Sequence, residues 1–426
     1  MKVTVIGAGL AGCEAAWQLS LRGVMVDLIE MKPKAFSPAH HNPDFAELVC
    51  SNSLKNDSLD FPTGVLKAEL REMGSLLMQC ADEAKVPDSA SLSVDRAKFS
   101  KLVTNRIRGN PLINIQIKEA TEFEKNAPTI VAAGPLCSEK LAQFIENLTG
   151  ERLYFYDAVA PIVSGDSIDM SKAFYLDKHS EEQNYLNCPL TKSEYELFVN
   201  ELAKAERVNL HDFEKEVNFE GCLPVEVMAR RGKDVLRFGP MRASGLKFGE
   251  GEPYAVVQLR RENVAGDMFN LVGFQTNLTF SEQKRVFSLI PALHNAEWLR
   301  YGVMHRNTYI NAPKYLNRFF QLKSHPNIMF AGQISGVEGY VESIASGLLC
   351  GINMVKYILG KSLVDFSTET CLGALSNYLE AGSESHFQPM HINWGLLKPI
   401  DAPKQKKKQL LAERALEKIK AIKSKI

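Results

Sequence analysis

The sequence has no net charge, no long apolar run and no paired cysteines, and each absence excludes a class of protein. Its 50 basic and 50 acidic residues balance, so any contact with a polyanion such as RNA must come from local basic patches. No apolar run reaches the roughly 18 residues of a membrane-spanning helix. The eight cysteines are scattered, without the spacing of a metal site or a disulfide framework.

The start of the chain shows no pattern of a targeting segment. Met1 to Ile6 lead directly into a strand and a turn, so we expect no signal peptide. The scattered cysteines are then expected to be free thiols in a reducing cytoplasm, with neither a metal nor a membrane as partner. With 426 residues, 45% of them hydrophobic, the chain has room for two or three domains.

The first thirty residues predict a strand, a glycine turn, a helix and a second strand. The turn Gly7-Ala8-Gly9-Leu10-Ala11-Gly12 matches the pattern G-x-G-x-x-G. Its first glycine permits the tight turn, the second lets the backbone approach a pyrophosphate, and the third lets helix and strand pack closely. Glu30 ends the second strand, where a carboxylate accepts from ribose hydroxyls and disfavours a 2′-phosphate. Together these features predict a site for the ADP half of a dinucleotide, rather than an ordinary turn of a doubly wound sheet.

Two later segments favour FAD over NAD as that dinucleotide. A predicted strand at Thr129–Ala133 ends in Gly134, and a second at Asn327–Phe330 leads into Gly332 and Gln333. A helix of small residues follows Gly339 and begins at Tyr340, whose ring is predicted to stack on a flavin or folate or simply to pack at the helix end. An N-terminal turn, a middle strand and a C-terminal turn form the layout of a split FAD domain.

The remaining pattern completes an α/β fold: a Rossmann-like split FAD-binding domain with a mixed α+β insertion domain. Residues 1–160 and 301–400 are predicted to form the FAD-binding domain, 161–300 the insertion and 401–426 a basic C-terminal tail. We expect a long irregular segment from Met31 to Pro62 and helices at the following ranges: Val65–Met78, Asp95–Arg108 and Ser138–Leu148. The tail predicts a short basic amphipathic helix that touches RNA or stays mobile.

Two cysteines lie in surroundings that suit a reactive thiol. Cys50 falls in the long irregular segment, beside small polar residues. Cys222 is followed closely by four basic residues, and nearby cations stabilise a thiolate. Local context alone leaves each of them equally well explained as a small buried side chain, which is our expectation for the other six cysteines. The basic residues, which either bind RNA phosphates or form a solvated face, are Arg230, Arg231, Lys233 and Arg237.

Several strings of residues together resemble one known family. They are the glycine turn, Glu47–Leu54, Glu220–Glu226, Arg237–Met241 and Gly336–Ser343. With them, the chain from Met1 to about Pro399 resembles the folate- and FAD-dependent RNA uracil-5-methyltransferases, TrmFO. These are related to the longer GidA-type tRNA-modifying flavoproteins, which carry a further helical C-terminal domain.

The resemblance implies an enzyme that forms 5-methyluridine in RNA, at the T-loop uridine (position 54) of tRNA. Methylenetetrahydrofolate would donate the carbon, FAD would relay it and NAD(P)H would supply electrons. Ribosomal RNA is the alternative substrate, and a flavin oxidoreductase acting on a small molecule is the alternative enzyme. The four basic residues near Cys222 would then bind RNA, whose target uridine must be flipped out of its stack.

The family's two motif cysteines fall on Cys50 and Cys222. Addition of a thiolate at C6 of uracil makes C5 nucleophilic, and a base must then remove the C5 proton. We favour Cys222 as the C6 nucleophile and Cys50 as the base or the partner of the flavin. The opposite assignment stays open.

Overall fold

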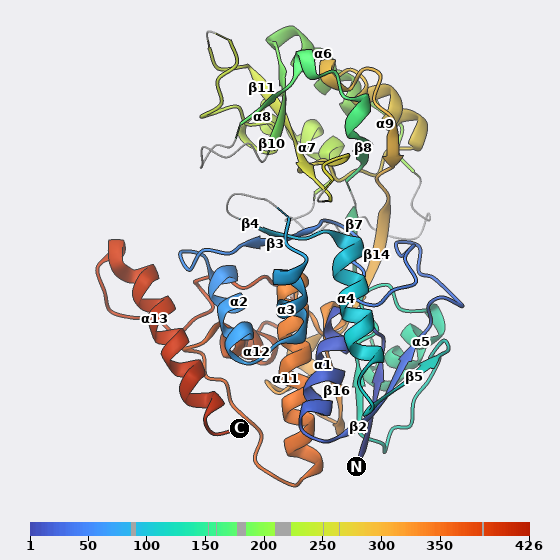
Figure 1. Ribbon diagram of the computed structural model, residues 1–426, viewed down its shortest axis with the longest axis vertical. Helices are drawn as coiled ribbons and strands as arrows, with labels where there is room; N and C mark the ends of the chain where they lie inside the picture. The colour runs from blue at the N-terminus through green and yellow to red at the C-terminus, as the bar shows by residue number, and fades with distance from the viewer. Residues whose placement is uncertain are drawn as a thin grey trace.

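The computed structural model describes residues 1–86, 91–151, 153–158, 160–176, 185–208, 223–249, 251–263, 265–385 and 387–426. They form two parts, one above the other in Figure 1, each with its own sheet and hydrophobic core. The lower part contains both termini. Because the chain leaves the lower part near residue 160 and returns near residue 300, the upper part is an insertion.

A six-stranded sheet forms the centre of the lower part, in the order β15-β16-β6-β1-β2-β5. All neighbours pair in parallel except β15, which pairs antiparallel with β16 at one edge. The strands are β1 (Lys2–Ile6), β2 (Met25–Glu30), β5 (Ile113–Ile117), β6 (Thr129–Val131), β15 (Gln321–Leu322) and β16 (His325–Phe330). Strands from both ends of the chain therefore complete one sheet, as the predicted α/β fold with a split FAD-binding domain requires.

The helices of the lower part cover this sheet, and two of them pack unusually closely. A Cβ on Gly347 of α11 (Tyr340–Ile358) would lie 2.2 Å from the carbonyl oxygen of Ala11 in α1 (Leu10–Leu21). Small residues at this crossing thus bring the two helix starts together beside the sheet. The other elements are α4 (Arg96–Arg108), α5 (Glu139–Thr149), α10 (Ala312–Tyr315), η5 (Gln333–Ser335), α12 (Cys371–Ala381) and the pair β3 (Ser53–Asn56) and β4 (Ser91–Ser93).

The insertion is a second six-stranded sheet, antiparallel throughout, in the order β13-β8-β12-β11-β10-β9. Its strands are β8 (Ile162–Ser164), β9 (Phe174–Tyr175), β10 (Tyr185–Leu190), β11 (Ala255–Arg261), β12 (Met268–Leu271) and β13 (Trp298–Arg300). Its helices are η1 (Gly165–Ser167), η2 (Met170–Lys172), α6 (Lys192–Lys204), α7 (Val225–Arg231), α8 (Val235–Phe238), α9 (Phe280–Phe287) and η4 (Pro291–Leu293). This mixture confirms the predicted α+β character of the insertion.

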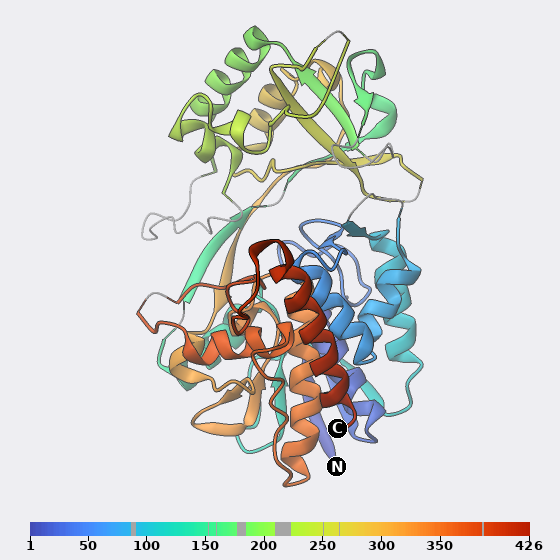
Figure 2. The ribbon, with the colours of Figure 1, turned by 90° about the vertical axis from the view of Figure 1, so that its left-hand side faces the viewer.

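A two-stranded antiparallel ribbon joins the two parts. It consists of β7 (Leu153–Ala158) and β14 (Met304–Tyr309), paired along their full length, and it crosses the space between the parts in both views (Figures 1 and 2). The buried core of the insertion falls between Val163 and Ala296. The domain boundaries at residues 160, 300 and 400 stay a proposal.

The predicted single helix at Val65–Met78 is wrong. The structure has two helices, α2 (Pro62–Glu72) and α3 (Leu76–Glu83), with Gly74 between them at φ 75°. Glycine adopts this left-handed conformation without strain, and Ser75 then caps α3 by accepting from the Met78 amide. The apolar period continues across the turn, which is why the pattern suggested one helix.

The C-terminal segment forms a long docked helix, so a mobile tail does not describe it. Helix α13 (Lys404–Lys423) packs on α2 and buries Leu411, Ala415 and Ile419, and Lys423 pairs with Glu72 at 3.0 Å. Figure 2 shows α13 lying along the lower part. Among the described residues, the helices lack the length and apolar stretch needed to span a bilayer.

Candidate active site

The glycine turn has the geometry that a dinucleotide site needs. A Cβ on Gly12 would lie 1.8 Å from the Gly7 carbonyl oxygen, so only glycine lets α1 start this close to the strand. Gly9, in contrast, has open space where a Cβ would point, and that space is where a pyrophosphate approaches the backbone. Glu30 Oε2 accepts from the Ala8 amide at 2.7 Å and Oε1 from the Lys32 amide at 2.9 Å. The acid is thereby fixed beside the turn.

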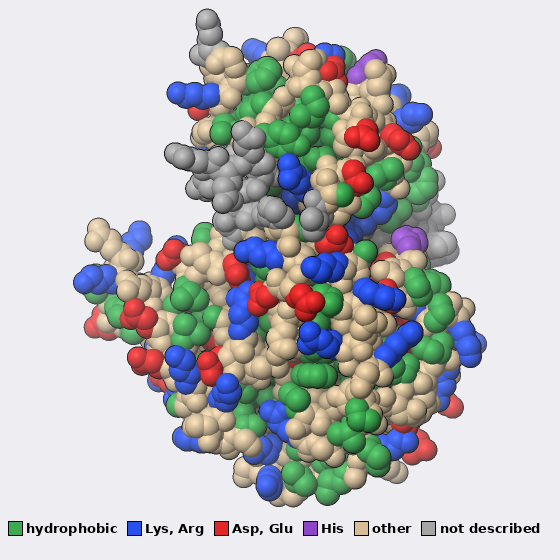
Figure 3. All heavy atoms as spheres, in the orientation of Figure 1, with side chains coloured by type: hydrophobic (Ala, Val, Ile, Leu, Met, Phe, Trp, Pro, Cys, Tyr) green, Lys and Arg blue, Asp and Glu red, His purple; other side chains and the backbone are tan. Residues whose placement is uncertain are grey.

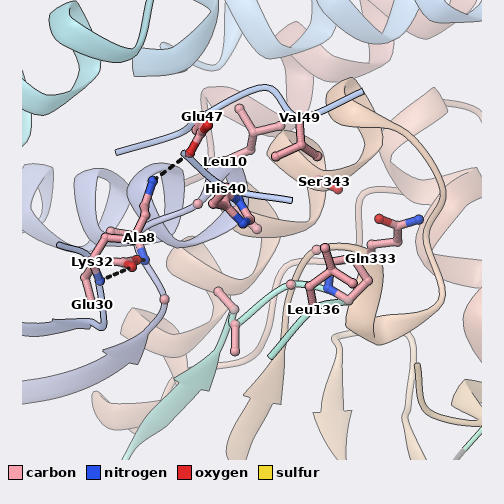
Figure 4. Close-up of a pocket in the computed structure, with 18 of the residues that line it drawn as sticks. Ala8, Leu10, Glu30, Lys32, His40, Glu47, Val49, Leu136, Gln333 and Ser343 are labelled. Atoms are coloured by element: carbon pink, nitrogen blue, oxygen red, sulfur yellow. Dashed lines mark hydrogen bonds and ion pairs between the residues drawn. The ribbon is translucent and has the colours of Figure 1, made fainter. Parts of the chain in front are cut away.

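A pocket lies over this turn. It is lined by the start of α1, by the segment 132–136 after β6 and by Gly332 and Gln333 after β16. The close-up in Figure 4 shows Glu30 and Lys32 at one side, with Leu136 and Gln333 at the other. The predicted cofactor residues that line it are Gly7, Ala8, Gly9, Leu10, Ala11, Glu30, Gly134, Gly332, Gln333 and Tyr340. An extended, mostly apolar pocket that ends on helix N-termini fits FAD.

Three polar residues of the long irregular segment also line this pocket, and no local pattern in the sequence marks them: Lys32, His40 and Glu47. Lys32 Nζ donates to the carbonyls of Asn42 and Asp44 at 2.9 and 2.6 Å. It also pairs with Glu47 at 3.3 Å (Figure 4). The His40 ring shares a hydrogen bond with Ser37 Oγ, and burial together with Lys32 lowers the pKa of His40. These contacts order the segment as one wall of the pocket.

A second cavity continues from the first. The two share Val49, Pro135, Leu136, Gln333, Tyr340 and Ser343. The second is also lined by Cys50 and Gly339 from the lower part and by residues of the insertion, Arg260, Val272 and Gln275. It therefore lies between the two parts of the molecule, at the far end of the dinucleotide pocket.

Tyr340 joins the cofactor pocket to the cysteine loop. Its hydroxyl accepts from the amides of Cys50 and Ser51 at 2.8 and 3.1 Å. Burial, and next the nearby Cys50, raise the pKa of Tyr340, so the hydroxyl stays neutral. That the ring stacks on a flavin or folate, or packs at the helix end, stays a prediction; the hydroxyl anchors the loop.

A buried carboxylate of α11 faces the second cavity. Glu342 is fully buried and lines the cavity together with Lys55 and His391. Its Oε1 accepts from the Ile392 amide at 3.1 Å, whereas Oε2 has no hydrogen-bond partner among the described residues. A buried acceptor without a donor is costly, so the site suits a ligand that brings N–H groups.

Of the two predicted thiols, the structure describes one. Cys50 is partly buried in the second cavity, and Cys222 lies outside the described residues. Val225 donates its amide to the carbonyl of Gln275 at 2.7 Å, and Gln275 lines the cavity.

Most of the other cysteines are buried, as expected. Cys137 is partly buried, and the other five are buried: Cys13, Cys80, Cys188, Cys350 and Cys371. Burial raises the pKa of these five thiols, to about 11 for Cys80 and about 12 for Cys188.

The structure describes all four predicted RNA-binding residues. Arg230 donates to the Ala203 carbonyl at the end of α6 at 2.9 Å. Arg237 stacks 3.8 Å from the centre of the Tyr254 ring and pairs with Asp234. Arg237 is half-buried, whereas Arg230, Arg231 and Lys233 are exposed.

Comparison with known proteins gives one family. The model of the family described as glucose inhibited division protein A, GIDA, matches residues 2–362. The curated methylenetetrahydrofolate–tRNA-(uracil-5-)-methyltransferase TrmFO of Acetivibrio thermocellus is 53% identical, with 99% of this chain and 98% of the relative covered. The TrmFO of Geobacter sulfurreducens is 52% identical, with 97% of each covered.

The fold comparison agrees with the sequence comparison. A solved structure of Aquifex aeolicus GidA superposes with a TM-score of 0.73 at 15% identity, and the match covers this whole chain and 75% of that one. The likeness confirms a GidA-like flavoprotein fold.

Proposed function

Because the chain belongs to the TrmFO family, we propose that it forms 5-methyluridine in RNA, with tRNA as the substrate. Methylenetetrahydrofolate supplies the carbon, FAD relays it, and NAD(P)H supplies the electrons. The observation that carries this proposal is the continuity of the two cavities, which brings the dinucleotide pocket to Cys50 and to the insertion. A cytoplasmic location is part of the proposal, since the chemistry needs free thiols.

The residues around the first pocket fit FAD. The backbone at Gly9 would receive the pyrophosphate, and Glu30 would receive the ribose hydroxyls. When bound, FAD supplies carbon relay and hydride chemistry at its flavin end. Gln333 and Tyr340 line both the first pocket and the second cavity, and Gly134 lines the first. These three residues are proposed to hold the flavin end.

Folate is proposed to enter the second cavity. The pterin ring of a folate carries adjacent N–H donors on one edge, and Glu342 Oε2 is a buried acceptor without a donor. Glu342 would therefore orient the pterin ring in the second cavity. Tyr340 lines the same cavity.

The thiols keep the roles proposed from the family motif. Cys222 adds to C6 of uracil, and Cys50 removes the proton from C5. Cys50 lines the cavity itself. Cys222 lies three positions before Val225, whose amide donates to the carbonyl of the cavity residue Gln275, so the length of the chain allows both thiols to serve one substrate.

RNA would bind across the insertion and the lower part. Three of the four predicted residues are exposed, Arg230, Arg231 and Lys233, and we propose them as phosphate ligands. Exposed lysines also gather where α13 begins, at the left edge of the face in Figure 3: Lys404, Lys406, Lys407 and Lys408. We propose these as further phosphate contacts.

Label transfer tests the proposal. Purified protein with FAD, a reduced nicotinamide and labelled methylenetetrahydrofolate should form labelled 5-methyluridine in unmodified tRNA. Cys50→Ala and Cys222→Ala should each lower the rate by at least about a thousandfold and leave FAD bound, whereas Cys137→Ala, another partly exposed thiol, should retain activity.

Two other results of the label-transfer experiment would change the proposal. Label in ribosomal RNA instead of tRNA would move the same chemistry to the alternative substrate. Oxidation of the nicotinamide with label in neither RNA would overturn the proposal and favour a flavin oxidoreductase acting on a small molecule.

A further inference from the structure

Guanidinium groups from both parts of the molecule hold the segment that carries Cys50. Arg96, at the start of α4 in the lower part, donates to the carbonyls of Leu48 and Cys50 at 2.9 and 3.1 Å. Arg300, at the end of β13 in the insertion, donates to the carbonyls of Val49 and Cys50 at 3.2 and 3.3 Å. The Cys50 carbonyl thus accepts one charge-assisted hydrogen bond from each part.

A carboxylate from the insertion completes this cluster. Glu262 directly follows β11, and its side chain is 3% exposed. Its Oε2 lies 2.7 Å from Arg96 Nε, and its Oε1 accepts from Arg96 Nη2 at 3.1 Å. Two guanidinium groups and one carboxylate leave one positive charge in excess. An uncompensated charge in such a place is costly, and a thiolate on Cys50 would neutralise it.

We propose that Arg96 and Arg300 are positioning residues that hold Cys50 as a thiolate, and that this state requires the insertion to be docked on the Cys50 loop. The proposal deepens the proposed function, because it rests on Cys50 acting as a thiolate in methyl transfer. Cations close to a thiol favour its ionised form. Since Arg300 belongs to the insertion, withdrawal of the insertion would remove one of the two cations.

A second contact crosses the same boundary. Asn52, two residues after Cys50, is fully buried and donates to the carbonyl of Arg261 at 2.9 Å. Because Arg261 precedes Glu262, this bond fixes the carboxylate relative to the loop. The insertion therefore contacts the loop on both sides of Cys50.

The charges around Cys50 come from several elements. Burial and Arg96 lower the pKa of Arg300, while Glu262 and Cys50 act in the opposite direction, which places all four groups in one electrostatic cluster. Tyr340 faces the loop from α11 with a neutral hydroxyl. The other titratable groups that line the cavity are Lys55, Arg260, Glu338, Glu342 and His391.

Alkylation of Cys50 as a function of pH tests the proposal. The holoenzyme would be treated with iodoacetamide, and the rate at Cys50 followed by peptide mass spectrometry. The midpoint of the rate profile reports the pKa of the thiol, whereas exposure changes only the plateau reached at high pH. We expect a midpoint below the usual thiol value of about 8.5.

Two substitutions should move that midpoint in opposite directions. Arg300→Gln removes a positive charge and should raise the midpoint by about one pH unit, which slows alkylation near pH 7 about tenfold. Glu262→Gln removes the negative charge and should lower the midpoint, with alkylation roughly threefold faster near pH 7. A merely structural role for the cluster predicts a changed plateau with the midpoint in place.

The internal control is Cys137, a partly exposed thiol of the same chain, whose profile should stay the same in both variants. Equal midpoints in all three proteins, or shifts of the same sign in both variants, would overturn the proposal. Alkylation needs neither folate nor RNA, so its result stands apart from label transfer. Wild-type protein that forms no 5-methyluridine would overturn the proposed function. If its midpoints still diverge as expected, the proposal that Arg96 and Arg300 hold Cys50 as a thiolate stands.

Discussion

The glycine turn and the Cys50 loop belong to one continuous site, yet they are built in opposite ways. The turn depends on backbone atoms and on Glu30, all within the first thirty residues. The Cys50 loop depends on side chains 46, 250 and 290 positions away in the chain, those of Arg96, Arg300 and Tyr340. Damage to the turn should therefore remove the cofactor, whereas damage to the supports of the loop should disable the thiol and leave the cofactor bound.

Gly12→Ala is expected to break the turn most severely. The new Cβ would lie 1.8 Å from the Gly7 carbonyl oxygen, so α1 must move away from the strand, at a cost of about 3 kcal/mol or more. Gly9→Ala is the matched control, because nothing lies within 4 Å of its Cβ. Thermal unfolding without FAD should show a large loss for Gly12→Ala alone. FAD titration should show affinity reduced at least about tenfold for both, and normal binding by Gly9→Ala would argue against this pyrophosphate site.

Lys67→Met removes the side chain that holds β3, the strand that follows the Cys50 loop. The fully buried ammonium donates to the carbonyls of Leu54 and Asn56 at 2.8 and 2.7 Å and to that of Lys55 at 3.2 Å. Removing it leaves these carbonyls without a donor, so unfolding should become easier by about 3 kcal/mol. FAD affinity, once the protein is folded, should change less than about threefold.

Lys67 should also make the stability of the protein depend on pH, in a direction that its pKa shift defines. Burial lowers the pKa of Lys67 from 10.5 to about 8, against the attraction of Asp57. Between these values the unfolded chain holds the proton more firmly, so this contribution to stability rises with pH from about 8 to 10.5. The stability difference between wild type and Lys67→Met should widen across that range, and a constant difference would contradict the shift.

Tyr340→Phe should affect the loop more gently. The variant loses the acceptor for the amides of Cys50 and Ser51, which costs about 1–2 kcal/mol. We expect kcat to fall about tenfold with FAD content unchanged. Tyr378→Phe is the control, since its hydroxyl donates to the Gln388 carbonyl outside both cavities. Loss of FAD from Tyr340→Phe would mean that the ring supports the cofactor rather than the loop.

Glu30→Gln should have the smallest effect. A glutamine retains one acceptor but turns an N–H group toward one of the two amides now bound, those of Ala8 and Lys32. FAD affinity should fall about tenfold, while the rate at saturating FAD stays near that of wild type. Asp27→Asn, on the same strand but outside the pocket, should leave affinity unchanged. A reduced rate at saturation would extend the role of Glu30 beyond binding.

The parts of the fold that the sequence predicts are those set by nearby residues. The strand, turn and helix at the N-terminus follow from glycine spacing, and the predicted helix at Asp95–Arg108 is α4, which Asp95 caps by accepting from the Lys98 amide. The split sheet follows from two strands that each end in glycine, at Gly134 and Gly332. In each case a short segment contains the whole signal.

The residues that the sequence did not reveal act over long separations. Arg96, Arg300 and Glu262 are single charged residues in ordinary helix and strand patterns, and only the docking of the insertion brings them to Cys50. Glu342 is a first-turn acid of α11, and only its burial beside an open cavity marks it as unusual. No local pattern distinguishes these residues from surface charges.

The β7–β14 ribbon has a mechanical consequence. Two strands bonded edge to edge resist sliding past each other, because every hydrogen bond of the ladder would have to break. Such a narrow ribbon bends across its face more easily than a wider sheet does, since its sheet has two strands among the described residues. The ribbon is anchored where it meets the lower part, because the Thr308 amide donates to the Pro135 carbonyl and Tyr309 packs in the core. Asn307 of the ribbon lines the second cavity, so bending of the ribbon would change the volume of the chamber in which the thiol and its substrates meet.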